Sequence, residues 1–142
     1  MWHQLRKMAK NIMYHGSMEQ GLKIIVPKKS VTSHSQKAKN ERIVYVTDDK
    51  AYASGFVFPW SEKDGFEFGR VGEDDWTLEI PKRHVDRLKK PCSIYEVEGD
   101  FTKLNTDTPE WVSHEDVKVV REDAYDSVEE CLIKNGVKII ID

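Results

Sequence analysis

The short length of the apolar segments is the feature of this sequence that most constrains its fold. Residues 42–47 are rich in β-branched side chains, and residues 93–98 alternate apolar and acidic side chains, as a half-buried strand does. Similar segments predict strands at residues 11–15, 22–26, 76–80 and 117–120, and a buried last strand at residues 137–141. No apolar run approaches the roughly 20 residues that a membrane-spanning helix requires, so we expect no membrane segment and no membrane partner.

Helical segments are interspersed with these strands without a strict alternation. They are predicted at residues 48–58, 81–90 and 123–134. Asp48 and Asp123 are placed to cap the first and the last of these helices, and Pro81 suits the first position of the middle one. Because strands and helices do not alternate regularly, the order of segments predicts an α+β fold rather than a doubly wound parallel sheet.

The polar stretches between these elements predict loops. Residues 1–10 are expected to form an arm or a short helix, and residues 28–41 a loop that is a candidate lid over a site. Residues 61–75 are a Gly-containing insertion in which a small hairpin is expected, and residues 101–110 are a further loop. A chain of 142 residues is long enough to bury a core of its own, so we expect one domain over residues 1–142.

Cysteine usage and charge narrow the setting. Cys92 and Cys131 have no Cys or His neighbours at metal-binding spacing, so we expect two free thiols in the core, a cytoplasmic protein and no metal site. The first 44 residues hold nine Lys or Arg against two acidic residues, whereas the whole chain has a net charge of −3. This basic third can attract a polyanion or hold phosphates, and a solvated basic face is an equal alternative.

The candidate site begins at the end of the first predicted strand, where His15, Gly16 and Ser17 follow one another. Glycine permits positive φ and close approach of the backbone to a ligand, and histidine donates or accepts hydrogen bonds near neutral pH. An ordinary strand that ends in a glycine turn has the same residues, so the triplet needs support from elsewhere in the chain. His84 and His114 are expected to be solvated side chains rather than catalytic ones.

Five short motifs in a fixed order supply that support. The signature motifs of dinucleotide-binding folds, P-loops, serine hydrolases and zinc proteases are absent from the sequence. The order of motifs instead resembles the ADP-ribosyltransferase superfamily of the His-Tyr-Glu type, and within it the small bacterial rifampin ADP-ribosyltransferase-like enzymes. The motifs are Tyr14-His15-Gly16-Ser17, Val44-Tyr45-Val46-Thr47, Ala51-Tyr52-Ala53, Ile94-Tyr95-Glu96-Val97 and Ser113-His114-Glu115-Asp116-Val117. The resemblance covers residues 12–120 and implies a split β-sheet core with a few short helices.

The resemblance also implies that NAD is the co-substrate and gives roles to individual residues. His15 would hold a ribose hydroxyl of the adenosine half, Gly16 would bond the nicotinamide amide through its backbone, and Ser17 would lie near the nicotinamide. Tyr45 would stack on the nicotinamide ring, with Tyr52 as a second aromatic residue, because an aromatic face attracts the positively charged ring. For both tyrosines a place in the core is an equal alternative.

A carboxylate near the ribose 2′-hydroxyl is a further implication of the resemblance. It would stabilise the positive charge that develops as nicotinamide departs. Glu115 is the expected residue, because it lies just before a late strand as the family's glutamate does. Glu96, Glu98 and Asp100, on the mid-chain strand and its turn, are alternatives. ADP-ribose would pass to an acceptor that the sequence leaves open between a protein side chain, a nucleic acid base and a small molecule.

Two other functions fit the same fold. An RNA 2′-phosphotransferase would need basic residues at a phosphate pocket, and the sequence has no clear cluster of arginines for that task. A non-catalytic domain that binds NAD, a nucleic acid or a protein is the other alternative. The presence of His15, Tyr45 and Glu115 together argues against this second one.

Overall fold

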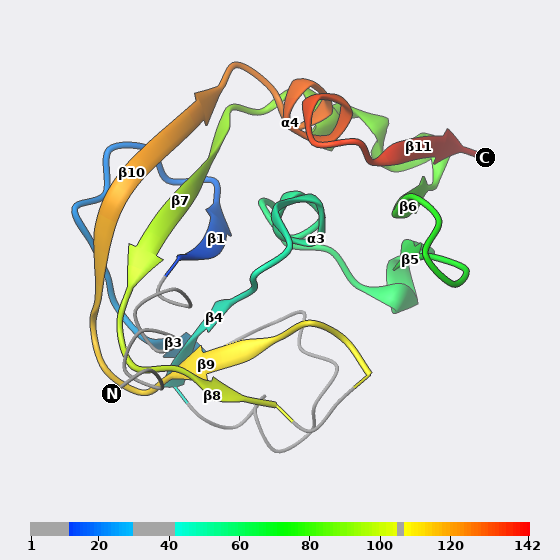
Figure 1. Cartoon of the computed structure of the whole chain (residues 1–142). Coiled ribbons are helices and arrows are strands. Elements are labelled where there is room, and N and C mark those ends of the chain that lie inside the picture. The colour runs from blue at the N-terminus through cyan, green and yellow to red at the C-terminus, as the bar shows by residue number, and fades with distance from the viewer. Residues whose placement is uncertain (1–11, 30–41, 105–106) are drawn as a thin grey trace.

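A computed structural model describes residues 12–29, 42–104 and 107–142 of the chain. These residues form three β-sheets and a few short helices, so the fold is α+β, as expected (Figure 1). The expected arm at residues 1–10 lies outside the described residues, and so does the part of the expected loop that follows Lys29. None of the described helices is long and apolar enough to cross a membrane.

The first sheet is antiparallel and curls around one side of the molecule (Figure 1). Its strands follow the order β1 (Met13–Ser17), β7 (Cys92–Glu98), β10 (Val117–Tyr125) and β2 (Ile24–Ile25). The register pairs His15 with Tyr95, and β10 carries an irregularity between Val119 and Arg121. Such a bulge increases the local twist of a strand, which agrees with the curvature of this sheet.

Two smaller sheets complete the strand arrangement. One is antiparallel, in the order β3 (Lys28–Lys29), β4 (Arg42–Val46), β9 (Trp111–Ser113) and β8 (Thr102–Lys103). In the other, β11 (Lys138–Ile141) pairs in parallel with β6 (Thr77–Ile80), and β6 pairs antiparallel with β5 (Glu67–Gly69). The expected hairpin therefore exists, but its second strand is β6 rather than a segment within residues 61–75.

The helices are short, and the two α-helices begin at polar caps. They are α3 (Lys50–Ser54), α4 (Val128–Lys134) and the 3-10 helices η1 (Glu62–Asp64) and η2 (Lys82–Lys89). The Asp49 carboxylate accepts hydrogen bonds from the backbone N–H groups of Ala51 and Tyr52, and so caps α3. Figure 1 shows α3 between the curled first sheet and the β5–β6–β11 sheet.

Several predicted boundaries were wrong, and tertiary pairing explains the largest shift. The cap of α3 is Asp49 rather than Asp48, and the middle helix is a 3-10 helix. Asp123 caps no helix, because β10 continues to Tyr125 along its partner β7 and includes it. Asp123 instead forms an ion pair with Lys50 at 2.5 Å. The last helix begins after Ser127, whose hydroxyl accepts a hydrogen bond from the Glu130 N–H at 3.0 Å.

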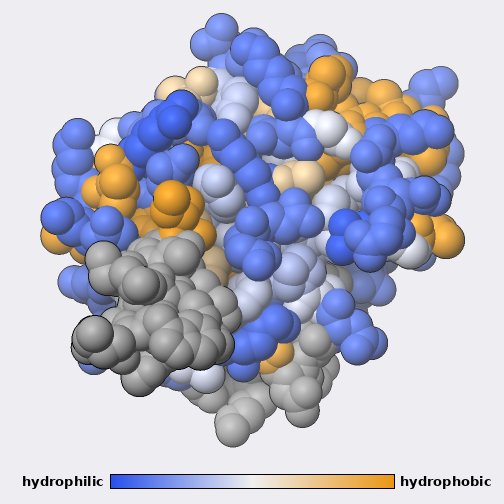
Figure 2. Space-filling model, viewed as in Figure 1, coloured by the Kyte–Doolittle hydropathy of each residue, from blue (hydrophilic) through white to orange (hydrophobic). Residues whose placement is uncertain are grey.

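The last strand exists as expected but is not buried. β11 is an edge strand of its sheet, so only part of its surface is covered, and Ile140 and Ile141 are exposed. The face in Figure 2 is mostly hydrophilic, with apolar side chains gathered over α4 and β11 among other places. Ile133 of α4 is exposed as well.

The core consists mainly of two clusters of buried apolar side chains. The larger one surrounds α3 and α4 and contains aromatic residues together with Cys92 and Cys131, which are buried free thiols as expected. The smaller one lies inside the curl of the first sheet and includes Met13, Tyr95 and Val97.

A narrow junction connects the first sheet to β4 and α3. Tyr14 and Thr47 exchange two backbone hydrogen bonds, of 2.8 and 3.0 Å, which link β1 to the end of β4. Gly16, two residues after Tyr14, packs against the chain within and just after α3. A Cβ atom on Gly16 would come within 2.7 Å of the Ala53 carbonyl oxygen and 2.8 Å of Val57 Cγ1. Gly16 is therefore required for close packing of the backbone, and its φ is not positive.

We expect Gly16→Ala to lower the free energy of unfolding by about 1–3 kcal/mol, because the added methyl group would push β1 away from α3. Gly69→Ala is the matched control, since a Cβ atom there meets no heavy atom within 4 Å. Urea denaturation of both variants measures the difference. Equal stability of the two variants would contradict a tight junction.

Candidate functional site

A cavity of about 600 Å³ opens at the junction of β1, β4 and α3. Its wall combines apolar side chains from both core clusters with a small set of polar ones. The polar and aromatic groups on the wall are Tyr14, His15, Ser17, Glu19, Lys28, Tyr45, Thr47, Tyr52, Phe56, Phe58 and Glu110. A concave, largely apolar site with a few polar groups is typical of small-molecule binding.

His15 is held in one orientation by the junction. Its Nδ1 lies 2.7 Å from the carbonyl oxygen of Tyr45. A carbonyl oxygen only accepts, so Nδ1 carries the hydrogen and Nε2 of the neutral ring is an acceptor. Burial lowers the pKa of His15 below its ordinary value of 6.5, the bond to Tyr45 opposes this, and the positive charge of Lys28 adds to the lowering. At neutral pH the imidazole is therefore neutral.

Gly16 and Ser17 both line the cavity, and each also has a structural role. Gly16 provides the close approach to α3 described above. The Ser17 hydroxyl accepts a hydrogen bond from the backbone N–H of Glu19 at 3.0 Å, which tightens the turn after β1. The Ser17 hydrogen remains available to donate to a ligand.

The two predicted tyrosines both line the cavity, but they differ in how far their rings are buried. Tyr45 of β4 is half-buried and lines the cavity. Tyr52 of α3 is 3% exposed, and its ring packs against Phe56, Trp76 and Phe68 at centroid distances of 4.8, 5.0 and 5.7 Å. The ring of Tyr52 is thus enclosed by aromatic residues, and its place is in the core.

Phe56 is an aromatic residue of the site that the sequence analysis missed. It lies two residues after α3, is half-buried and lines the cavity. Its ring stacks on Trp60 with a centroid distance of 5.5 Å and an interplanar angle of 26°. A half-buried ring on the cavity wall is better placed to contact a planar ligand than the enclosed ring of Tyr52. The apolar run after α3 was visible in the sequence, but not which of its residues faces the cavity.

Glu110 is the buried carboxylate of the cavity, and the sequence predicted a loop at its position. It is 6% exposed, and its Oε1 accepts a hydrogen bond from Thr108 Oγ1 at 2.8 Å. It lies immediately before β9, which pairs with β4 so that Trp111 stands opposite Val46. The signal in the sequence was the apolar pair Trp111-Val112, which marks a short strand directly after Glu110.

Glu115, the expected catalytic carboxylate, does not line the cavity. It is exposed in the turn after β9, where its backbone N–H and carbonyl group both bond to the Ser113 hydroxyl, at 3.1 and 3.0 Å. The three alternatives lie outside the cavity as well. Glu96 of β7 is 3.9 Å from Arg121, and Glu98 and Asp100 are exposed.

Of the two histidines expected to be solvated, His114 is exposed and His84 is not. The His84 ring stacks on Phe66 at a centroid distance of 5.4 Å, so it contributes to packing. In the part of the chain that the structure describes, no group of three or more His, Cys, Asp or Glu side chains is arranged to hold a metal ion.

We expect acid to destabilise the protein through His15. The folded-state pKa lies below 6.5, whereas the unfolded chain titrates near 6.5, so the unfolded state binds the proton first as the pH falls. The His15 contribution to stability is therefore complete above pH 6.5 and decreases as the pH falls from there toward the folded-state pKa. Denaturant unfolding of the wild type and of His15→Gln across this range measures it. Parallel stability curves for the two proteins would contradict the expectation.

Comparison with protein-family models, with curated proteins and with solved structures found no match. The candidate site is therefore defined by its own geometry. That geometry brings together His15, Gly16, Ser17, Tyr45 and Tyr52 of the predicted set, and adds the residues Phe56 and Glu110.

Proposed function

We propose that the protein is an NAD-dependent ADP-ribosyltransferase, which cleaves the bond between nicotinamide and ribose and transfers ADP-ribose to an acceptor. The observation that supports this most is the meeting of His15, Tyr45 and the buried carboxylate of Glu110 on one cavity wall. A histidine, a tyrosine and a glutamate are the three residue types that the sequence resemblance requires. The split β-sheet core that it implies is part of the same proposal.

His15 would bind a ribose hydroxyl of NAD. Its Nδ1 is occupied by the Tyr45 carbonyl group, so Nε2 is the atom that accepts a hydrogen bond from the ligand. Desolvation keeps the ring neutral, which preserves this acceptor at neutral pH. A protonated ring would have no acceptor atom.

Tyr45 and Phe56 would contact the nicotinamide ring. Both line the cavity and both are half-buried, so part of each side chain is accessible from the cavity. The nicotinamide ring carries a positive charge while it is part of NAD, and the electron-rich face of an aromatic side chain attracts it. This interaction weakens as the ring leaves as neutral nicotinamide.

Glu110 would stabilise the charge that develops during cleavage. When the bond between ribose C1′ and the nicotinamide nitrogen breaks, nicotinamide keeps the electron pair and positive charge develops on the ribose. A carboxylate on the wall of a mostly apolar cavity stabilises this charge more than water does, because the surroundings have a low dielectric constant. The bond from Thr108 Oγ1 to Oε1 holds the carboxylate before the substrate arrives.

We expect the protein to bind NAD, and His15→Ala to lose this binding. Removal of the imidazole takes away the acceptor for the ribose hydroxyl. Ligand-observed NMR with purified protein and NAD measures both, and nicotinamide release is followed in the same tube. His114→Ala, a change at an exposed position, is the control that should bind as the wild type does. An absence of binding to the wild type at millimolar NAD would refute the proposed function.

We expect Glu110→Gln to reduce nicotinamide release from NAD by about two to three orders of magnitude, because it removes the negative charge and keeps the shape of the side chain. NAD binding should persist in this variant. Glu115→Gln is the matched control, with the same chemical change outside the cavity, and should retain most of the activity. A large loss in Glu115→Gln and a small one in Glu110→Gln would return the catalytic role to Glu115.

A further inference from the structure

The hydroxyl group of Tyr52 is an unusual feature of the cavity wall. Its oxygen is buried, and it has no hydrogen-bond partner among the described residues. Burial of a hydroxyl without a partner destabilises a folded protein, so such groups are rare in native structures. A phenylalanine would fill the same space in the aromatic cluster without this cost.

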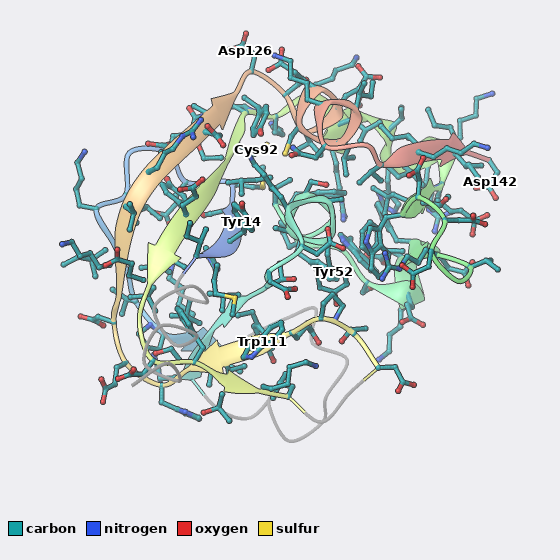
Figure 3. The ribbon with its side chains drawn as sticks, viewed as in Figure 1. Tyr14, Tyr52, Cys92, Trp111, Asp126 and Asp142 are labelled. Carbon is teal, nitrogen blue, oxygen red and sulfur yellow. The ribbon has the colours of Figure 1, made fainter. Side chains whose placement is uncertain are left out.

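The position of this hydroxyl is fixed by the packing of its ring. Phe56, Phe68 and Trp76 contact the ring from different directions. The backbone N–H of Tyr52 is bound to Asp49 Oδ1 at 3.2 Å, which fixes the start of α3. Figure 3 shows Tyr52 on the side of α3 that is nearer to Trp111 of β9. A partner for the hydroxyl must therefore come to it.

Glu110 is a buried carboxylate that lines the same cavity as Tyr52. Burial raises the pKa of Tyr52 most, and the negative charge of Glu110 raises it further. Thr108 and Tyr45 have smaller effects on this pKa. The hydroxyl is therefore protonated at neutral pH and is a donor. Thr108 binds Glu110 Oε1, while Oε2 accepts no hydrogen bond from the described part of the chain.

We propose that Tyr52 is a positioning residue, whose hydroxyl donates a hydrogen bond to the Glu110 carboxylate and holds it toward the substrate when NAD is bound. This inference rests on the proposed function. Thr108 and Tyr52 would then hold one carboxylate oxygen each. The enclosed ring would hold the Tyr52 hydroxyl in place, and the hydroxyl would orient the Glu110 carboxylate.

Tyr52→Phe tests the proposal through turnover, with NAD as substrate and water as acceptor. We expect kcat for nicotinamide release to fall at least roughly tenfold while KM stays within about twofold, because the lost bond acts on the carboxylate and not on NAD binding. Tyr125→Phe is the matched control, since Tyr125 is buried outside the cavity and its hydroxyl accepts from Asn135 Nδ2 at 3.1 Å. An unchanged kcat in Tyr52→Phe would overturn the proposal.

Thermal unfolding of the same variants without NAD separates positioning from a structural role. Tyr52→Phe should keep or raise the Tm, because it removes a buried hydroxyl without a partner, whereas Tyr125→Phe should lower it. A fall in Tm for Tyr52→Phe as large as that for Tyr125→Phe would show a structural hydrogen bond and overturn the proposal.

A spectroscopic measurement tests the contact between Tyr52 and Glu110 independently of turnover. The ¹³C resonance of the Glu110 carboxylate, measured with NAD present, should differ between the wild type and Tyr52→Phe and should not change in Tyr125→Phe. An unchanged resonance in Tyr52→Phe would refute the contact. If the wild type neither binds NAD nor releases nicotinamide, the proposed function fails and this proposal fails with it; NAD binding with an unchanged resonance in Tyr52→Phe would refute the contact alone.

Discussion

Two backbone hydrogen bonds between Tyr14 and Thr47 are the contact on which the candidate site depends. They join β1 of the first sheet to the end of β4 in another sheet, so that the two strands meet at one point rather than along their length. This meeting places His15 beside the Tyr45 carbonyl group, which orients the imidazole. Gly16 keeps the junction narrow, because the chain at α3 lies where a side chain would be. The cavity lies next to this junction.

Asp49 provides a second constraint, which fixes α3 in the middle of the molecule. One carboxylate oxygen caps the helix, and the other accepts a hydrogen bond from Trp76 Nε1 at 2.9 Å. Trp76 stacks on Phe68, and the Arg70 guanidinium lies 4.5 Å from the centroid of its ring. A helix of five residues is not stable alone, so these contacts hold it in place. The orientation of Tyr52 follows from them.

Local patterns were sufficient to predict much of the architecture. The α+β class agrees with the structure, and the strand predicted over residues 42–47 is β4, which ends at Val46. His15, Gly16, Ser17, Tyr45 and Tyr52 line one cavity. The prediction was wrong where pairing with a distant segment decides the outcome. Asp123 has the properties of a helix cap, but the long ladder between β7 and β10 draws it into a strand. The apolar pattern of β11 did not reveal that this strand lies at a sheet edge.

The sequence by itself determined the fold class and the place of most strands, because strand patterns and the histidine-glycine pair are local properties. Only the tertiary structure decided which of Glu110 and Glu115 shares a cavity with His15. Glu115 and Glu110 are five positions apart and chemically the same, and both lie next to a strand. Pairing of β9 with β4 buries Glu110 beside Thr108 and leaves Glu115 in the exposed turn after that strand. Which of the two carboxylates is buried depends on the register between strands that are far apart in the chain, and no local sequence pattern specifies that register.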